Sequence, residues 1–217
     1  VNNMHSNLEK IKKNEGKPKV IKDIFSKKEI NEFIELYNEL PITVHNKKQN
    51  VIKKRWLVEY GKDLERLFYN KLKNEIGDFK YDNLKTDDGN DILGLFQESY
   101  NPIGLHIDGG FNLEDLIYKQ TLIPLTPVGS TVIFKNRFYG QSTNFTIDKK
   151  ELEKKDLKYG QNKRSSEHLG LYGNKPFDKD LHKKFINHEK IENLAGLEVE
   201  LIYEWEVCLL YTSDAAD

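Results

Sequence analysis

The strongest constraint on the fold of this chain is a change in its hydrophobic pattern near residue 91. Before this point, apolar residues recur at the three- and four-residue spacing of an amphipathic helix. After it, short apolar runs alternate with Gly, Pro and polar turn residues, which is typical of strands. A doubly wound parallel sheet would need a helix between these runs. The pattern therefore predicts a mainly β domain, a sandwich or barrel, with flanking helices.

Two helices are predicted before the β region. Ser26 and Glu29 have the spacing of a capping box, and the apolar stripe that follows them ends before Pro41. A second stripe predicts a helix over residues 62–76. Both stripes are most simply explained as surfaces that pack against the core.

The remaining elements are predicted from short segments. A further helix is expected at 180–192. The polar stretch from 137 to 177 is expected to form either a lid over the site or a solvated surface segment, and a short helix is expected within it at 149–155. The strands predicted from short apolar runs are 20–25, 92–100, 118–125, 130–135 and 197–205.

The length of 217 residues suits one domain. Residues 1–19 are polar and are expected to be a disordered tail. Residues 20–206 are expected to form a single domain, with its helices within about 26–76 and its β core within about 91–206.

Composition limits the classes of function. Lys and Arg total 34 and Asp and Glu total 35, a net charge of -1, so nothing recommends nucleic acid or an anionic membrane as a partner. No apolar run approaches the roughly 18 residues of a membrane span, and a cytoplasmic location is expected. The single cysteine, Cys208, excludes a thiolate metal cage. The cluster Lys53–Arg55 is interpreted as a solvated face.

The motif with most chemical content is His106-Ile107-Asp108. Side chains alternate along a strand, so His106 and Asp108 would share one face. One nitrogen and one oxygen donor fit the two-histidine, one-carboxylate site of non-haem Fe(II) oxygenases, whereas structural zinc would call for more sulfur or histidine. So short a motif also arises by chance, and a merely hydrogen-bonding pair is the alternative.

The order of the segments resembles the Fe(II)- and 2-oxoglutarate-dependent dioxygenase superfamily, in its prolyl-hydroxylase-like and phytanoyl-CoA-hydroxylase-like range. The resemblance covers most of residues 20–206. It implies a double-stranded β-helix, a distorted jelly roll, with the metal between its two sheets. The segments that carry it are VIKDIFSKKEINEFIELYNELP, QESYNPIGLHID, KQTLIPLTPVGSTVIF and HEKIENLAGLEVELIYEW.

The resemblance implies that His106 and Asp108 are Fe(II) ligands and catalytic residues. It also implies 2-oxoglutarate and O2 as co-substrates, and hydroxylation of a small molecule or peptide. Gln97 and Tyr100, on the strand before the motif, and Lys119, at the start of the next strand, are candidates to bind 2-oxoglutarate. The alternatives are core packing for the first two and plain surface exposure for Lys119.

The resemblance also implies a third ligand, a His with a basic neighbour on a strand after Trp205, and the chain has neither there. Residues 207–217 are similar to a translated sequencing-adaptor tail. We expect them to be non-native, the last strands to be missing, and iron binding and turnover to be weak. His168, His182 and His188 are alternative third ligands, each with a competing interpretation as a surface or helix residue.

Two other functions stay open. The first is a noncatalytic, cupin-like jelly-roll binding module in which His106 and Asp108 only form hydrogen bonds. The second is a cupin-like metalloprotein of other chemistry, although cupin sites usually draw on more histidines. Arg137 is expected at the surface, and Trp56 and Trp205 are expected to pack with their N–H groups bonded.

Overall fold

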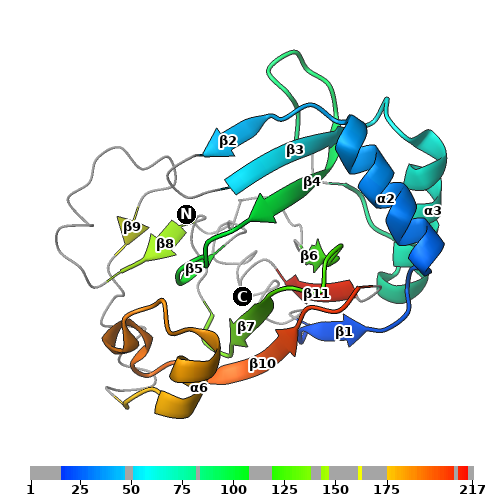
Figure 1. Ribbon diagram of the computed structural model, residues 1–217. Helices are drawn as coiled ribbons and strands as arrows, with labels where there is room; N and C mark the ends of the chain where they lie inside the picture. The colour runs from blue at the N-terminus through cyan, green and yellow to red at the C-terminus, as the bar shows by residue number, and fades with distance from the viewer. Residues whose placement is uncertain are drawn as a thin grey trace, which may run out of the picture.

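The structure is a computed structural model, and it describes residues 16–46, 51–81, 84–107, 119–137, 143–146, 161–162, 175–207 and 210–214. These parts form a mixed α/β fold of small, mainly antiparallel sheets with three α-helices (Figure 1). Helices α2 and α3 lie together beside the strands, and α6 lies at the other end of the molecule. None of the described helices is long and apolar enough to cross a membrane.

The helices are α2 (Lys27–Glu39), α3 (Lys62–Ile76), α6 (Lys179–Phe185) and the 3₁₀ helix η1 (Ile191–Leu194). The strands are β1 (Lys19–Ile21), β2 (Val44–Asn46), β3 (Val51–Leu57), β4 (Ile92–Ser99), β5 (His106–Ile107), β6 (Lys119–Leu122), β7 (Ser130–Phe134), β8 (Thr143–Phe145), β9 (Gln161–Asn162), β10 (Val199–Glu204) and β11 (Leu210–Asp214). Hydrogen bonds join them as β1-β11-β6, β10-β7, β2-β3-β4 and β5-β8-β9, and every pair is antiparallel except β8 with β9.

Helix α2 confirms the predicted capping box. The Ser26 hydroxyl accepts a hydrogen bond from the backbone N–H of Glu29 at 3.3 Å, and the Glu29 carboxylate accepts one from the N–H of Ser26 at 2.7 Å. These bonds satisfy two donors that a helix start leaves unpaired. Helix α3 also has its predicted bounds.

The main core lies where α2 and α3 pack on β3 and β4. Phe25, Phe33, Trp56 and Phe68 form a ring cluster with centroid separations of 5.1 to 6.1 Å, in edge-on and stacked contacts. The indole N–H of Trp56 donates to the carbonyl of Tyr60 at 2.8 Å, as expected for a buried Trp.

Strand β3 was not predicted, and one interpretation of its sequence is wrong. Lys54 is buried, because its side chain lies on the face of β3 that packs against α2. Its ammonium donates to the carbonyl of Tyr37 at 2.6 Å and lies 4.1 Å from the Tyr37 ring centroid. A long cationic side chain can bury its aliphatic part when its charged group keeps such partners. The alternation of side chains between the two faces of β3 is hard to recognise in the sequence, because three basic residues follow one another.

A second, smaller core lies between β7 and β10. The indole N–H of Trp205 donates to the Thr131 hydroxyl at 3.0 Å, as predicted, and its ring lies against Gly129. A Cβ at Gly129 would lie 2.6 Å from that ring, which is too close, and φ at this residue is 134°, which side chains disfavour. Both the contact and the backbone conformation therefore favour glycine at this position. Arg137 is only 15% exposed and pairs with Glu200 at 2.7 Å, so its expected surface position is wrong.

The helix predicted at 180–192 is shorter in the structure. Helix α6 is capped by Asp178, whose carboxylate accepts from two backbone N–H groups, and it ends at Phe185. A turn separates it from η1, and His188 in this turn bonds to the carbonyl of Ile103, three residues before His106. The predicted helix at 149–155 and most of the 137–177 segment lie outside the described residues, as do residues 1–15 of the predicted tail.

Candidate metal centre

His106 is the first residue of β5, which is antiparallel to β8 and places His106 opposite Asn144. Ile107 is buried, at 6% exposure, and His106 is partly exposed. Alternation along the strand therefore anchors β5 in the core through Ile107 and turns the imidazole to the other face. This is the orientation that the motif predicted for His106.

A hydrogen bond determines which nitrogen of His106 carries the proton. Nδ1 lies 2.7 Å from the carbonyl oxygen of Gly104. Because a carbonyl only accepts, Nδ1 must be the donor in the neutral ring, and the lone pair is then on Nε2. Metal-binding histidines commonly donate their other N–H to a backbone carbonyl in this way. The geometry thus fits a metal ligand that binds through Nε2.

The carboxylate of the motif is not placed. Asp108 follows β5 directly but lies outside the described residues. Within the described ranges, which do not contain Asp108 or His168, no three His, Cys, Asp or Glu side chains gather as a metal site. Of the two predicted ligands, the structure therefore describes His106 but not Asp108.

Two of the alternative third ligands lie close to the motif but are bonded to backbone. Nε2 of His182 lies 2.8 Å from the carbonyl of Glu189, and Nε2 of His188 lies 3.0 Å from the carbonyl of Ile103. Because a carbonyl only accepts, Nε2 must be the donor in both neutral rings, and each ring then has its lone pair on Nδ1. The two rings hold the α6–η1 segment together and against the residues before His106.

The structure also brings forward a residue that sequence reasoning missed. The Glu189 carboxylate accepts the backbone N–H of Leu105 at 3.1 Å through Oε2, and the side-chain amide of Asn193 at 2.7 Å through Oε1. The same amide donates to the carbonyl of Phe145 in β8 at 3.1 Å. The one sequence signal was Asn193, an amide in the otherwise apolar turn before β10; buried amides need partners.

The candidate 2-oxoglutarate residues have different surroundings. Gln97 is exposed on β4 opposite Lys53. Tyr100 is 61% exposed, and its hydroxyl bonds to the Glu98 carboxylate; this hydrogen bond and the charge of Glu98 raise the pKa of Tyr100. Lys119 begins β6, as predicted, but its side chain lies outside the described part of the molecule.

Comparison with known proteins adds no assignment. No family model matches the chain, and neither a curated protein nor a solved structure similar to it was found. The candidate site therefore depends on its own geometry, chiefly the tautomer of His106.

Proposed function

We propose that this protein is an Fe(II)- and 2-oxoglutarate-dependent oxygenase that hydroxylates a small molecule or peptide. The supporting observation is the hydrogen bond from Nδ1 of His106 to the carbonyl of Gly104, which places the lone pair of the neutral ring on Nε2, the nitrogen that would bind the metal. A histidine and an aspartate two residues apart supply the mixed nitrogen and oxygen donors that non-haem iron uses.

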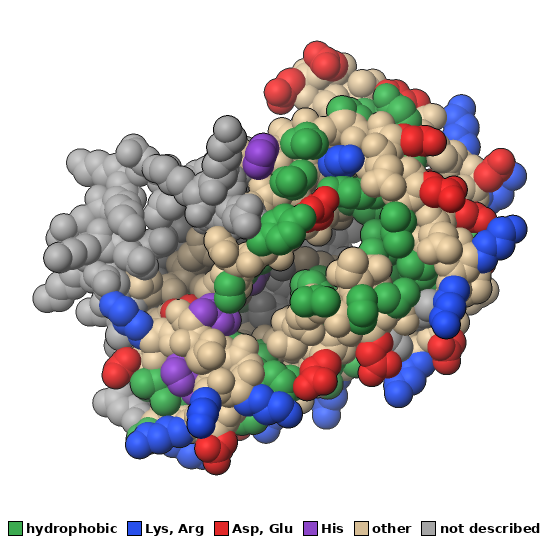
Figure 2. All heavy atoms as spheres, viewed as in Figure 1, with side chains coloured by type: hydrophobic (Ala, Val, Ile, Leu, Met, Phe, Trp, Pro, Cys, Tyr) green, Lys and Arg blue, Asp and Glu red, His purple; other side chains and the backbone are tan. Residues whose placement is uncertain are grey.

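A jelly-roll architecture is part of this proposal. Its support is the set of short, mainly antiparallel strands, with α2 and α3 packed on the face of β3 and β4 that carries Trp56 and Phe96. Figure 2 shows hydrophobic side chains gathered around a hollow in the middle of one face, while most charged side chains lie toward the outline of the molecule. A concave, apolar region ringed by polar groups is where a small-molecule site is expected.

The chain's residues would have distinct roles. Nε2 of His106 and the Asp108 carboxylate would hold the iron, and Lys119 would provide a positive charge for a carboxylate of 2-oxoglutarate. Gln97 and Tyr100 would offer neutral hydrogen bonds. Bound iron would couple the decarboxylation of 2-oxoglutarate by O2 to hydroxylation of a substrate C–H bond. The protein would orient the ligands and limit the access of water.

An anaerobic Fe(II) titration tests the ligands. We expect weak one-to-one binding by the 217-residue chain, because two protein ligands hold a metal less firmly than three. His106→Ala and Asp108→Ala should each weaken it by about tenfold or more, and both should abolish any conversion of 2-oxoglutarate to succinate. His45→Ala, at an exposed histidine of β2, is the matched control. Equal affinity of all four proteins would refute the assigned ligands.

A noncatalytic binding module is the second candidate. Its support is that His106, His182 and His188 all bond to backbone carbonyls, which is also what a purely structural role for these histidines requires. In that case Fe(II) would not bind in one-to-one stoichiometry, and 2-oxoglutarate would not be consumed in its presence. Fe(II)-dependent succinate that disappears in His106→Ala would exclude this candidate.

A further inference from the structure

We propose that Glu189 is a positioning residue that acts on His106 through a single peptide group. The peptide between Gly104 and Leu105 has its C=O bonded to Nδ1 of His106 and its N–H bonded to Oε2 of Glu189. The contacts therefore form a continuous chain from carboxylate to peptide to imidazole. This inference rests on the proposed function, in which His106 binds the metal.

The peptide group transmits both orientation and charge. It is planar, so fixing its N–H direction also fixes its carbonyl direction. A carboxylate that accepts from the N–H polarises the group and makes its carbonyl a stronger acceptor for the imidazole N–H. Metal-binding histidines bonded directly to a carboxylate gain basicity in the same way. Here the carboxylate belongs to a residue 83 positions after His106, on a different segment.

The carboxylate is itself held in place. Asn193 donates to Oε1 of Glu189 and to the carbonyl of Phe145, and the side chain of Asn193 is 1% exposed. Phe145 in turn donates its N–H to the carbonyl of Leu105 at 2.8 Å. Glu189, β5 and β8 are thus joined in a closed hydrogen-bonded arrangement, so Oε2 has little freedom to leave the Leu105 N–H.

The glycine at 104 makes this contact sterically feasible. A Cβ at this position would lie 2.8 Å from Oε2 of Glu189, which is closer than real Cβ atoms approach an oxygen. The carboxylate would have to shift, which strains its bonds to Asn193 and Leu105. Gly104→Ala therefore disturbs the same contact as a change at Glu189, without altering any charge.

The test uses metal-free protein first. Ring nitrogen chemical shifts measured by NMR report the His106 tautomer, which we expect to be Nδ1–H in the parent chain. Glu189→Ala and Gly104→Ala should give a mixture of tautomers, whereas Glu189→Gln, which keeps an acceptor oxygen, should be intermediate. Glu192→Ala, at the exposed neighbour in η1, is the matched control and should match the parent.

The second readout is Co(II) affinity, measured by titration. We expect about a tenfold loss for Glu189→Ala and for Gly104→Ala, a smaller loss for Glu189→Gln, and none for Glu192→Ala. A parent-like tautomer and affinity in folded Glu189→Ala would overturn the inference, whatever its thermal stability. If the parent does not bind Co(II), the proposed metal function fails, and the tautomer comparison alone decides whether Glu189 positions His106.

Discussion

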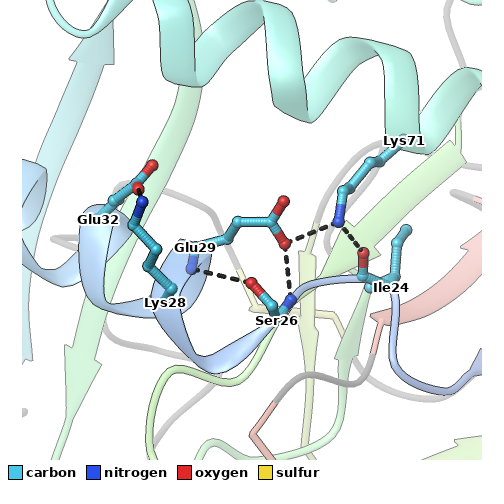
Figure 3. A network of polar contacts seen from close by, with 6 residues as sticks. All are labelled: Ile24, Ser26, Lys28, Glu29, Glu32 and Lys71. Carbon is cyan, nitrogen blue, oxygen red and sulfur yellow. Dashed lines mark hydrogen bonds and ion pairs between the residues drawn. The ribbon is translucent and has the colours of Figure 1, made fainter.

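At the scale of single residues, Glu29 connects the start of α2 to α3. Its carboxylate accepts from the Lys71 ammonium at 2.7 Å and from Ser26, and Lys71 also donates to the carbonyl of Ile24 at 2.8 Å (Figure 3). The sequence predicted the Ser26 contacts because they lie within one helical turn. It did not predict Lys71, which is 42 residues away in α3; such pairings depend on how the helices pack.

This network predicts a pH dependence of stability. Burial raises the pKa of Glu29, but the hydrogen bonds from Lys71 and Ser26 and the charge of Lys71 outweigh it, so the net pKa lies below 4.5. A depressed pKa gives stability that is present above the unfolded value and lost as the pH falls through the folded one. We expect Glu29→Gln to cost about 1–2 kcal/mol near neutral pH and progressively less as the pH falls below the ordinary pKa of a carboxyl group.

Urea unfolding between about pH 7 and about pH 3 measures this difference. Glu32→Gln is the control, because Glu32 faces Lys28 at 4.0 Å with both side chains well exposed, and such pairs contribute little. A cost for Glu29→Gln that does not change with pH would contradict the assigned ion pair.

At the scale of elements, the two faces of β3 and β4 differ. Opposite residues of an antiparallel pair share a face, so Trp56, Lys54 and Phe96 lie together toward α2, while Leu95 lies on the other face and is 52% exposed. The sequence predicted the strand β4 but not which face the helices cover. That choice depends on the aromatic side chains of α2 and α3, which are complementary to only one face.

This asymmetry predicts unequal costs for two truncations. Phe33 is 3% exposed and contacts three other rings, so Phe33→Ala should cost about 3–5 kcal/mol. Leu95→Ala should change stability by no more than about 0.5 kcal/mol. Chemical denaturation of both variants checks this, and comparable costs would mean that the opposite face is also covered.

At the scale of the whole molecule, the first and last described strands pair with each other. Strand β11 lies between β1 and β6, with three residue pairs to β1 and four to β6, as Figure 1 shows. Leu210, its first residue, is completely buried in the main core. The sequence interpretation of residues 207–217 as a non-native tail stays a prediction, and this burial offers a way to test it.

Leu210→Ala should cost about 2–5 kcal/mol if β11 is an integral strand. Val128→Ala, at a residue that is 76% exposed, should cost no more than about 0.5 kcal/mol. The free energies of unfolding of the two variants provide the comparison. Equal values would contradict the packing of β11 and would support an unrelated tail.

The sequence by itself determined several local features of this protein: the capped helix α2, the bounds of α3, the positions of β4, β6, β7 and β10, and the His106 motif. Each depends on periodicity or on contacts within a few residues. Only the tertiary structure decided the burial of Lys54, the tautomer of His106 and the contact of Glu189 with the Leu105 N–H. These depend on which distant segments meet, because a hydrogen bond or ion pair requires atoms within about 3 Å of each other.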